Sequence, residues 1–221
     1  MASVARNAFD ENVKDVKKLL ELHVKEGGRD KGRRYNLEVL NKSAIVLITA
    51  FWEAYCEDIA GEALAHIVQH APDASVLPKP LQKQVLNQLQ KEKHELALWK
   101  LADRGWRTVI KDRFDDLKVQ RERKLNTPKW ENIDLLFKEA IGLENVSKAW
   151  SWARKMNANN ARTKLDKYVT LRGAIAHRGN DGKSVTKSQV EDYFDFVQKL
   201  VGKTGGRVKT HVKNITGKEL W

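Results

Sequence analysis

The apolar residues of this chain recur at spacings of three and four, the period of an amphipathic α-helix, and no stretch alternates as a β-strand would. The strongest pattern runs from about Leu37 to His70 and predicts a long central helix. We therefore expect an all-α protein, a helical bundle with a long central helix and additional helices. The residues on the apolar face of the central helix are Ile48, Phe51, Trp52, Tyr55, Ile59, Ala63 and Ile67.

Glycine and proline divide the first half of the sequence into further helices. A helix is expected from Ser3 to about Lys25, because Gly27-Gly28 would end it. After the central helix, three prolines between positions 72 and 80 favour an extended connection. Two amphipathic helices are expected over 81–124, with a break near Gly105. Their expected core residues are Leu86, Leu89, Trp99, Leu101, Trp106 and Phe114.

Capping signals place two more helices in the second half. Thr127-Pro128 is typical of an N-cap followed by proline in the first helical position, and it opens a helix that ends at Gly142. A further helix is expected over 161–178, with Gly179 as its left-handed cap.

The last helix begins at a capping box, in which Thr186 and Gln189 satisfy each other's backbone donors. The pattern weakens after Gly202. We therefore expect one helical domain over residues 1–202, followed by a loose basic tail over 203–221.

The charge balance favours a polyanionic partner. The net charge is +12 and the pI is about 9.7. Basic residues gather around 121–124, in 199–218, and in one loop where we expect contacts with RNA phosphates; a solvated basic surface is an equal alternative for each cluster. The basic residues of that loop are Arg29, Lys31, Arg33 and Arg34.

The sequence also favours a cytoplasmic protein. It holds one cysteine, Cys56, too few for an internal disulfide. The first ten residues have no apolar stretch of signal-peptide length, and the longest uncharged stretch, 43–52, is too short to cross a bilayer. No membrane association is expected.

Candidate chemistry lies at the end of the 161–178 helix, where Arg172 and His177 stand five residues apart. An imidazole that moves a proton and a guanidinium that holds a phosphate are the two groups that metal-free RNA cleavage needs. Arg172 falls in the middle of the apolar stripe of its helix, so a carboxylate, a phosphate site or a wet cleft must lie there. We expect pairing with Glu53 or Glu57; a purely structural arginine–glutamate pair is the alternative.

His177 is expected in the last helical turn, where the helix dipole favours the imidazolium. On a regular helix, Arg172 and His177 lie about 140° apart. A shared site therefore requires the helix to unwind after Ala176, or a second subunit to complete it. A surface histidine without a role is the alternative.

Two segments together resemble a known family. The stretch Ala50–Asp58 (AFWEAYCED), followed more than 100 residues later by Leu171–Gly179 (LRGAIAHRG), is similar to the HEPN superfamily and most closely to its RiboL-PSP branch. The resemblance implies a helical bundle, usually dimeric, in which an R-x4-6-H motif cuts RNA without metal. The residue after the arginine is often polar in the family and is Gly173 here.

The resemblance also assigns roles. Arg172 and His177 would be the arginine and histidine of the motif, Glu53 the acidic helper and Glu57 a second candidate for it, with Arg178 and Asn180 in support. We expect a metal-independent endoribonuclease, without cofactor or bound metal, that acts as a homodimer on RNA. The family suggests a toxin or anti-phage defence effector with an antitoxin or defence protein as partner.

Three alternatives stay open. One is a non-catalytic HEPN module that binds RNA or a protein. Another is a DNA-binding regulator, although no helix-turn-helix pattern is evident. The third is a zinc site on one stripe of the central helix, which has no evident further ligand. That stripe holds Asp58, Glu62, His66 and His70.

Overall fold

A computed structural model describes residues 3–27, 37–92, 94, 96–123, 127–178 and 184–221, with the backbone alone at 117–123 and 177–178. These residues form seven α-helices and three short 3-10 segments, and no β-strand occurs among them. The prediction of an all-α bundle is confirmed. The elements are α1 (Val4–Gly27), α2 (Glu38–His70), η1 (Ala74–Val76), α3 (Lys79–Lys91), η2 (Ala97–Leu101), α4 (Gly105–Arg123), α5 (Trp130–Ile141), η3 (Val146–Ala149), α6 (Ala158–Arg178) and α7 (Lys187–Thr216).

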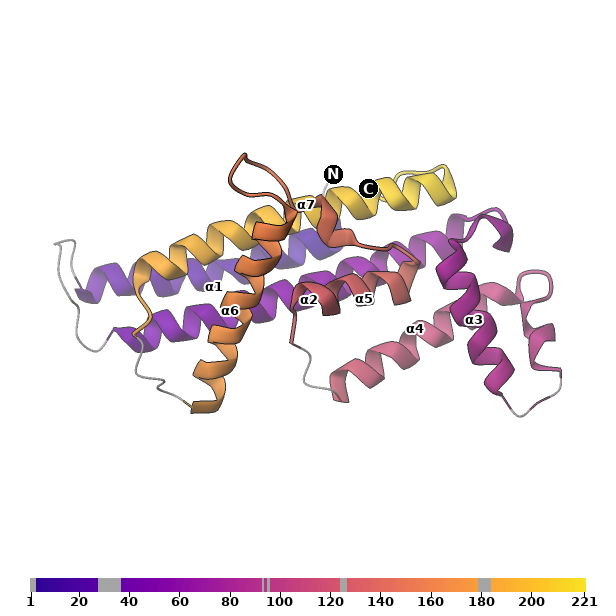
Figure 1. Cartoon of the computed structure of the whole chain (residues 1–221), viewed down its shortest axis with the longest axis horizontal. Helices are drawn as coiled ribbons and strands as arrows, with labels where there is room; N and C mark the ends of the chain where they lie inside the picture. The colour runs from indigo at the N-terminus through magenta and orange to yellow at the C-terminus, as the bar shows by residue number, and fades with distance from the viewer. Residues whose placement is uncertain (1–2, 28–36, 93, 95, 124–126, 179–183) are drawn as a thin grey trace.

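Helices α2 and α7 lie side by side and run in the same direction (Figure 1). Two hydrogen bonds, one near the start of both helices and one further along, fix the position of α7 along α2. The side-chain nitrogen of Asn41 donates to the backbone oxygen of Val185 at 2.8 Å, and the Tyr55 hydroxyl donates to that of Val201 at 3.1 Å. Helix α2 is buried on several sides, as expected of a central helix.

Helix α1 packs antiparallel to α2. The carboxylate of Glu62 accepts hydrogen bonds from the backbone nitrogens of Val4 and Ala5, at 3.3 and 3.0 Å. Seven residues earlier on α2, Tyr55 meets the ring of Phe9 edge to face, with ring centroids 5.7 Å apart. Glu62 therefore satisfies two of the donors that a helix leaves free in its first turn.

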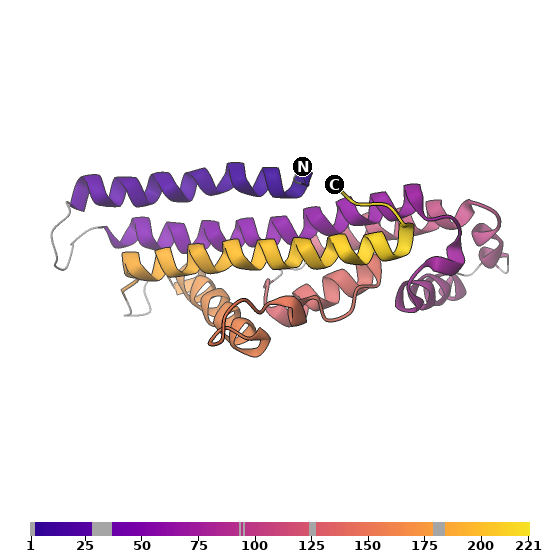
Figure 2. The same cartoon turned by 90° about the horizontal axis from the view of Figure 1, so that it is seen from above.

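The other side of this layer is covered by α5 and α6 (Figure 2). Helix α6 crosses the long helices steeply (Figure 1). Trp150, which follows η3, is fully buried. Its ring meets that of Trp52 edge to face, with ring centroids 5.8 Å apart, and its indole nitrogen donates a hydrogen bond to the Thr204 hydroxyl at 2.9 Å. The core is thus continuous from α2 through η3 to α7.

Most predicted boundaries are confirmed. Helix α2 is the longest, Gly105 opens α4 after the break that follows α3, and the Thr186–Gln189 capping box opens α7. Gly142 ends α5 in the left-handed conformation, with φ of 68°. The expected start of α5 is wrong: the helix begins at Trp130, and the Thr127 carbonyl accepts a bond from the side chain of Asn132 at 2.7 Å.

The expectation of a loose tail after Gly202 is also wrong. Helix α7 continues to Thr216, through three glycines. One of these is needed for packing, because a Cβ on Gly205 would stand 2.7 Å from the Tyr55 hydroxyl. Gly205 therefore marks the close approach of two long helices, three residues beyond the expected break at Gly202.

Two residues expected in the core lie at the surface. Leu86 on α3 and Trp99 on η2 are 41% and 73% exposed. The segment around Trp99 is a 3-10 turn, so its apolar residues do not follow the helical spacing assumed for them. Among the described residues, no helix has the length and apolar character needed to cross a membrane.

Candidate active site on helix α6

Helix α6 carries the candidate site and stays helical throughout. Its first turn is capped by Asn157, whose side-chain oxygen accepts a hydrogen bond from the backbone nitrogen of Asn160 at 2.9 Å. Leu165 and Val169 are buried against the core. The helix continues through Arg178, so it does not unwind after Ala176.

Arg172 lies on the inward side of α6 and is half-buried. Its Nε atom is buried and has no hydrogen-bond partner. The guanidinium is near Tyr193 of α7. Burial raises the pKa of that phenol, whereas the hydrogen bond with Thr49 and the positive charge of Arg172 lower it in part. Arg172 therefore places a positive charge at the junction of α6 with α7.

The expected pairing of Arg172 with Glu53 or Glu57 is wrong. Among the hydrogen bonds and ion pairs of the described residues, none joins Arg172 to either glutamate. Both glutamates instead line a small crevice with Pro128 and neighbouring residues of the 127–136 segment. Several elements pack around α2, and the side that carries these glutamates faces α5.

The absence of a partner sets Arg172 apart. In the part of the chain that the structure describes, the other arginines that are not exposed all donate hydrogen bonds. Arg113 binds the backbone oxygen of Glu139 at 2.6 Å, Arg107 that of Ala71 at 2.6 Å, and Arg162 the Ser147 hydroxyl at 2.8 Å. These three have the structural role that the sequence left open for Arg172.

His177 and Arg178 form the last residues of α6, and the structure describes their backbone alone. Asn180 lies outside the described residues, as does the expected Gly179 cap. Five residues of a regular helix advance about 7.5 Å and turn about 140°. Positions 172 and 177 therefore lie on different faces of α6.

The residues of the basic loop expected to contact RNA lie outside the described residues; they are Arg29, Lys31, Arg33 and Arg34.

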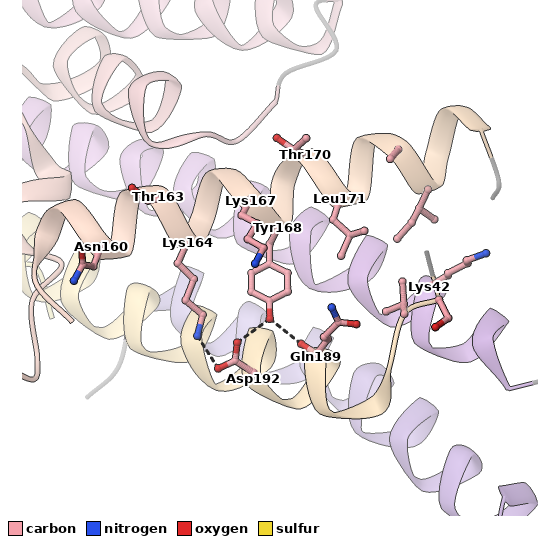
Figure 3. Close-up of a pocket in the computed structure, with 14 residues that line it drawn as sticks. Lys42, Asn160, Thr163, Lys164, Lys167, Tyr168, Thr170, Leu171, Gln189 and Asp192 are labelled. Atoms are coloured by element: carbon pink, nitrogen blue, oxygen red, sulfur yellow. Dashed lines mark hydrogen bonds and ion pairs between the residues drawn. The ribbon is translucent and has the colours of Figure 1, made fainter. Parts of the chain in front are cut away.

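A polar network around Tyr168, one helical turn before Arg172, was not predicted from the sequence. The Tyr168 hydroxyl lies 2.7 Å from a carboxylate oxygen of Asp192 and 3.1 Å from the backbone oxygen of Gln189, and Lys164 donates to the same carboxylate at 2.6 Å (Figure 3). Burial, followed by the Asp192 contact, raises the pKa of Tyr168. Burial acts to raise the pKa of Asp192, but the bonds from Lys164 and Tyr168 lower it overall. The spacing of Lys164 and Tyr168 places them on one stripe, whereas their meeting with Asp192 depends on how α6 packs against α7.

The structure brings no third ligand to the alternative zinc site at His66 and His70. The rings of His66 and His70 lie 4.4 Å apart, and Lys218 contacts Nδ1 of His70 at 3.4 Å. No group of three or more potential metal-ligating side chains is found among the described residues. Burial, the neighbouring His70 and Lys218 lower the pKa of His66.

Comparison with known proteins agrees with this fold. No curated protein and no solved structure matches the chain. The sequence model of the RiboL-PSP-HEPN family matches residues 11–208, from α1 to α7 and including Arg172 and His177. The chain therefore belongs to the RiboL-PSP branch of the HEPN superfamily.

Proposed function

We propose that this protein is a metal-independent endoribonuclease in which Arg172 and His177 do the chemistry. HEPN domains are often ribonucleases, and the match to the family covers both residues. The protein is basic overall, which favours RNA as the polyanionic substrate. The proposal needs no cofactor.

The observation that carries the proposal is the unpartnered guanidinium of Arg172. A half-buried arginine that served the fold would be expected to hold a carboxylate or a carbonyl, as Arg107 and Arg113 do. The Nε atom of Arg172 is buried without a hydrogen-bond partner among the described residues, which supports a role in holding a ligand. A phosphate fits, because guanidinium binds phosphate through two parallel hydrogen bonds.

In the proposed reaction, the ribose 2′-oxygen attacks the adjacent phosphorus and the bond to the 5′-oxygen breaks. His177 accepts the proton of the 2′-hydroxyl or supplies one to the leaving 5′-oxygen, while Arg172 stabilises the charge on the phosphorane. The products are a 2′,3′-cyclic phosphate and a 5′-hydroxyl. We assign no chemical step to Glu53 or Glu57, because both line the crevice beside α5.

The proposed active form is a homodimer. Because α6 stays regular through Arg178, one copy of the helix does not readily aim both groups at one phosphate. Two copies related by a twofold axis could supply Arg172 from one protomer and His177 from its partner. The cellular role we propose, a toxin or anti-phage effector with an antitoxin or defence protein as partner, rests on the family alone.

Cleavage of mixed RNA in excess EDTA tests this proposal, with wild type compared to Arg172→Ala, Arg172→Lys and His177→Ala. Arg154→Ala removes an exposed arginine and is the matched control. We expect cleavage by wild type and the control only. Because Arg172 holds no carboxylate, its removal should change the free energy of unfolding by less than about 1 kcal/mol. Full activity of His177→Ala, or RNA left uncut by wild type, would favour a module that only binds.

A further inference from the structure

A groove runs along α6 between Asn160 and Ile175. It encloses about 720 Å³ between α6, the segment 184–192 and Lys42 on the second turn of α2 (Figure 3). We call it the α6 groove. Its α6 wall extends from Asn160 to Ile175, a helical rise of about 22 Å. This cavity is therefore elongated, and its far end lies two residues before His177 in the sequence.

The side chains that line the groove carry a net positive charge. Three lysines and one aspartate line it: Lys42, Lys164, Lys167 and Asp192. Two of the three lysines already have a carboxylate partner: Lys164 pairs with Asp192 at 2.6 Å, and Lys42 pairs with Glu38 at 3.0 Å. Lys167 is exposed and makes no ion pair with any described residue, so its charge is available to a ligand.

The floor of the groove suits a nucleotide chain. Leu171, Ala174, Ile175 and Val185 give it an apolar surface between the charged groups. Tyr168 is part of the lining, but its ring is stacked on Tyr193 and its hydroxyl is bonded to Asp192. The wall beside it is consequently rigid. A single strand fits such an elongated groove better than a duplex does. Its phosphates can contact the lysines while its unpaired bases contact the apolar side chains.

We propose that the α6 groove binds a single-stranded segment of the RNA substrate and leads it to the end of α6. This inference rests on the proposed function and goes beyond it, because it names the form of the RNA and the surface that holds it. A second copy of the chain in the groove is the competing occupant.

Binding is measured in the His177→Ala background, so that RNA stays intact, by anisotropy of a short labelled RNA offered as single strand and as duplex. Lys167→Glu tests the charge, with Lys83→Glu on α3 as the control of equal charge change. Ala174→Trp fills the groove without a change of charge, with the exposed Ala65→Trp as its control.

We expect Lys167→Glu to weaken single-strand binding roughly tenfold and to reduce the slope of log K against log salt by about 0.7. Ala174→Trp should weaken binding without that change of slope, and both controls should bind like the parent. Duplex should bind more weakly than single strand. In the active protein, Lys167→Glu should raise KM and leave kcat unchanged.

The proposal is overturned if both groove variants bind RNA as their controls do, if duplex binds as tightly as single strand, or if Ala174→Trp dissociates a dimer while each protomer still binds RNA. Failure of the proposed function looks different. If the wild type never cleaves RNA but the groove variants lose RNA binding, the groove proposal is supported and the proposed ribonuclease function is contradicted. If the wild type cleaves RNA and the groove variants bind RNA like their controls, the ribonuclease function is supported and the groove proposal is contradicted.

Discussion

Tyr168 of α6 lies face to face with Tyr193 of α7, with ring centroids 4.1 Å apart and ring planes 11° apart. The Tyr193 hydroxyl in turn lies 3.0 Å from Oγ1 of Thr49 on α2. This chain of contacts ties the crossing helix to both long helices. Arg172 follows Tyr168 by one helical turn, so the stack also positions the proposed phosphate-binding group.

Tyr193→Phe keeps the stack and removes the hydroxyl. Because Thr49 Oγ1 is fully buried and also donates to the backbone oxygen of Ile45, it loses one of two partners. We expect the free energy of unfolding to fall by about 0.5–1.5 kcal/mol, while RNA cleavage persists. Urea denaturation of Tyr193→Phe, Thr49→Val and the double variant measures the coupling. Strict additivity of the two single changes would show that the contact contributes nothing.

Two glycines should respond oppositely to alanine. Gly173 lies inside α6 with nothing within 4 Å of an added Cβ, so Gly173→Ala should stabilise the protein by roughly 0.5–1 kcal/mol. Gly205 would place a Cβ 2.7 Å from the Tyr55 hydroxyl, and its substitution should destabilise. Thermal melting of the pair compares the two positions directly. A lower melting temperature for Gly173→Ala would contradict the open space beside α6.

Stability should fall as the solution is acidified. Burial lowers the pKa of His211, whose Nε2 lies 3.0 Å from the backbone oxygen of Ile141, so the folded state favours the neutral ring. Unfolding frees His211 to bind a proton near its ordinary pKa of about 6.5. The stabilisation is therefore present above that value and lost as the pH falls through the lowered pKa.

Urea unfolding from about pH 8 to about pH 5 measures this dependence. His211→Asn should show a shallower decline than wild type, although His66, whose pKa is also lowered, continues to contribute. Equal slopes for the variant and wild type would show that His211 is not the group responsible.

Mixing two inactive variants tests the shared site. If Arg172 and His177 come from different protomers, a heterodimer of Arg172→Ala and His177→Ala retains one intact site. Cleavage should then reappear after the two variants are exchanged and should be absent from each alone. Light scattering at micromolar concentration checks the dimer. A monomer that cuts RNA, or a mixture that stays inactive after proven exchange, would count against a composite site.

The sequence was enough for the helical class and for most helix boundaries, because local periodicity and capping carry that information. Gly142 and the Thr186–Gln189 box show this well. The pattern weakens after Gly202 and did not predict that α7 continues, because the packing of Gly205 against Tyr55 is a tertiary contact that local patterning does not reveal. The partner of Arg172 was predicted wrongly for the same reason. The sequence identifies the turn of α2 that carries Glu53, but the packing of the helices decides which neighbour faces that turn.

The central claim is that the 2′-hydroxyl is the nucleophile in a reaction run by Arg172 and His177. Its most direct test uses an RNA whose mapped cleavage site carries a single 2′-deoxy nucleotide, incubated with wild type in excess EDTA beside the unmodified RNA. The account predicts that the unmodified RNA yields a 2′,3′-cyclic phosphate and a 5′-hydroxyl, and that the modified site stays intact. Cleavage at the deoxy position, or products with a 3′-hydroxyl and a 5′-phosphate, would contradict it.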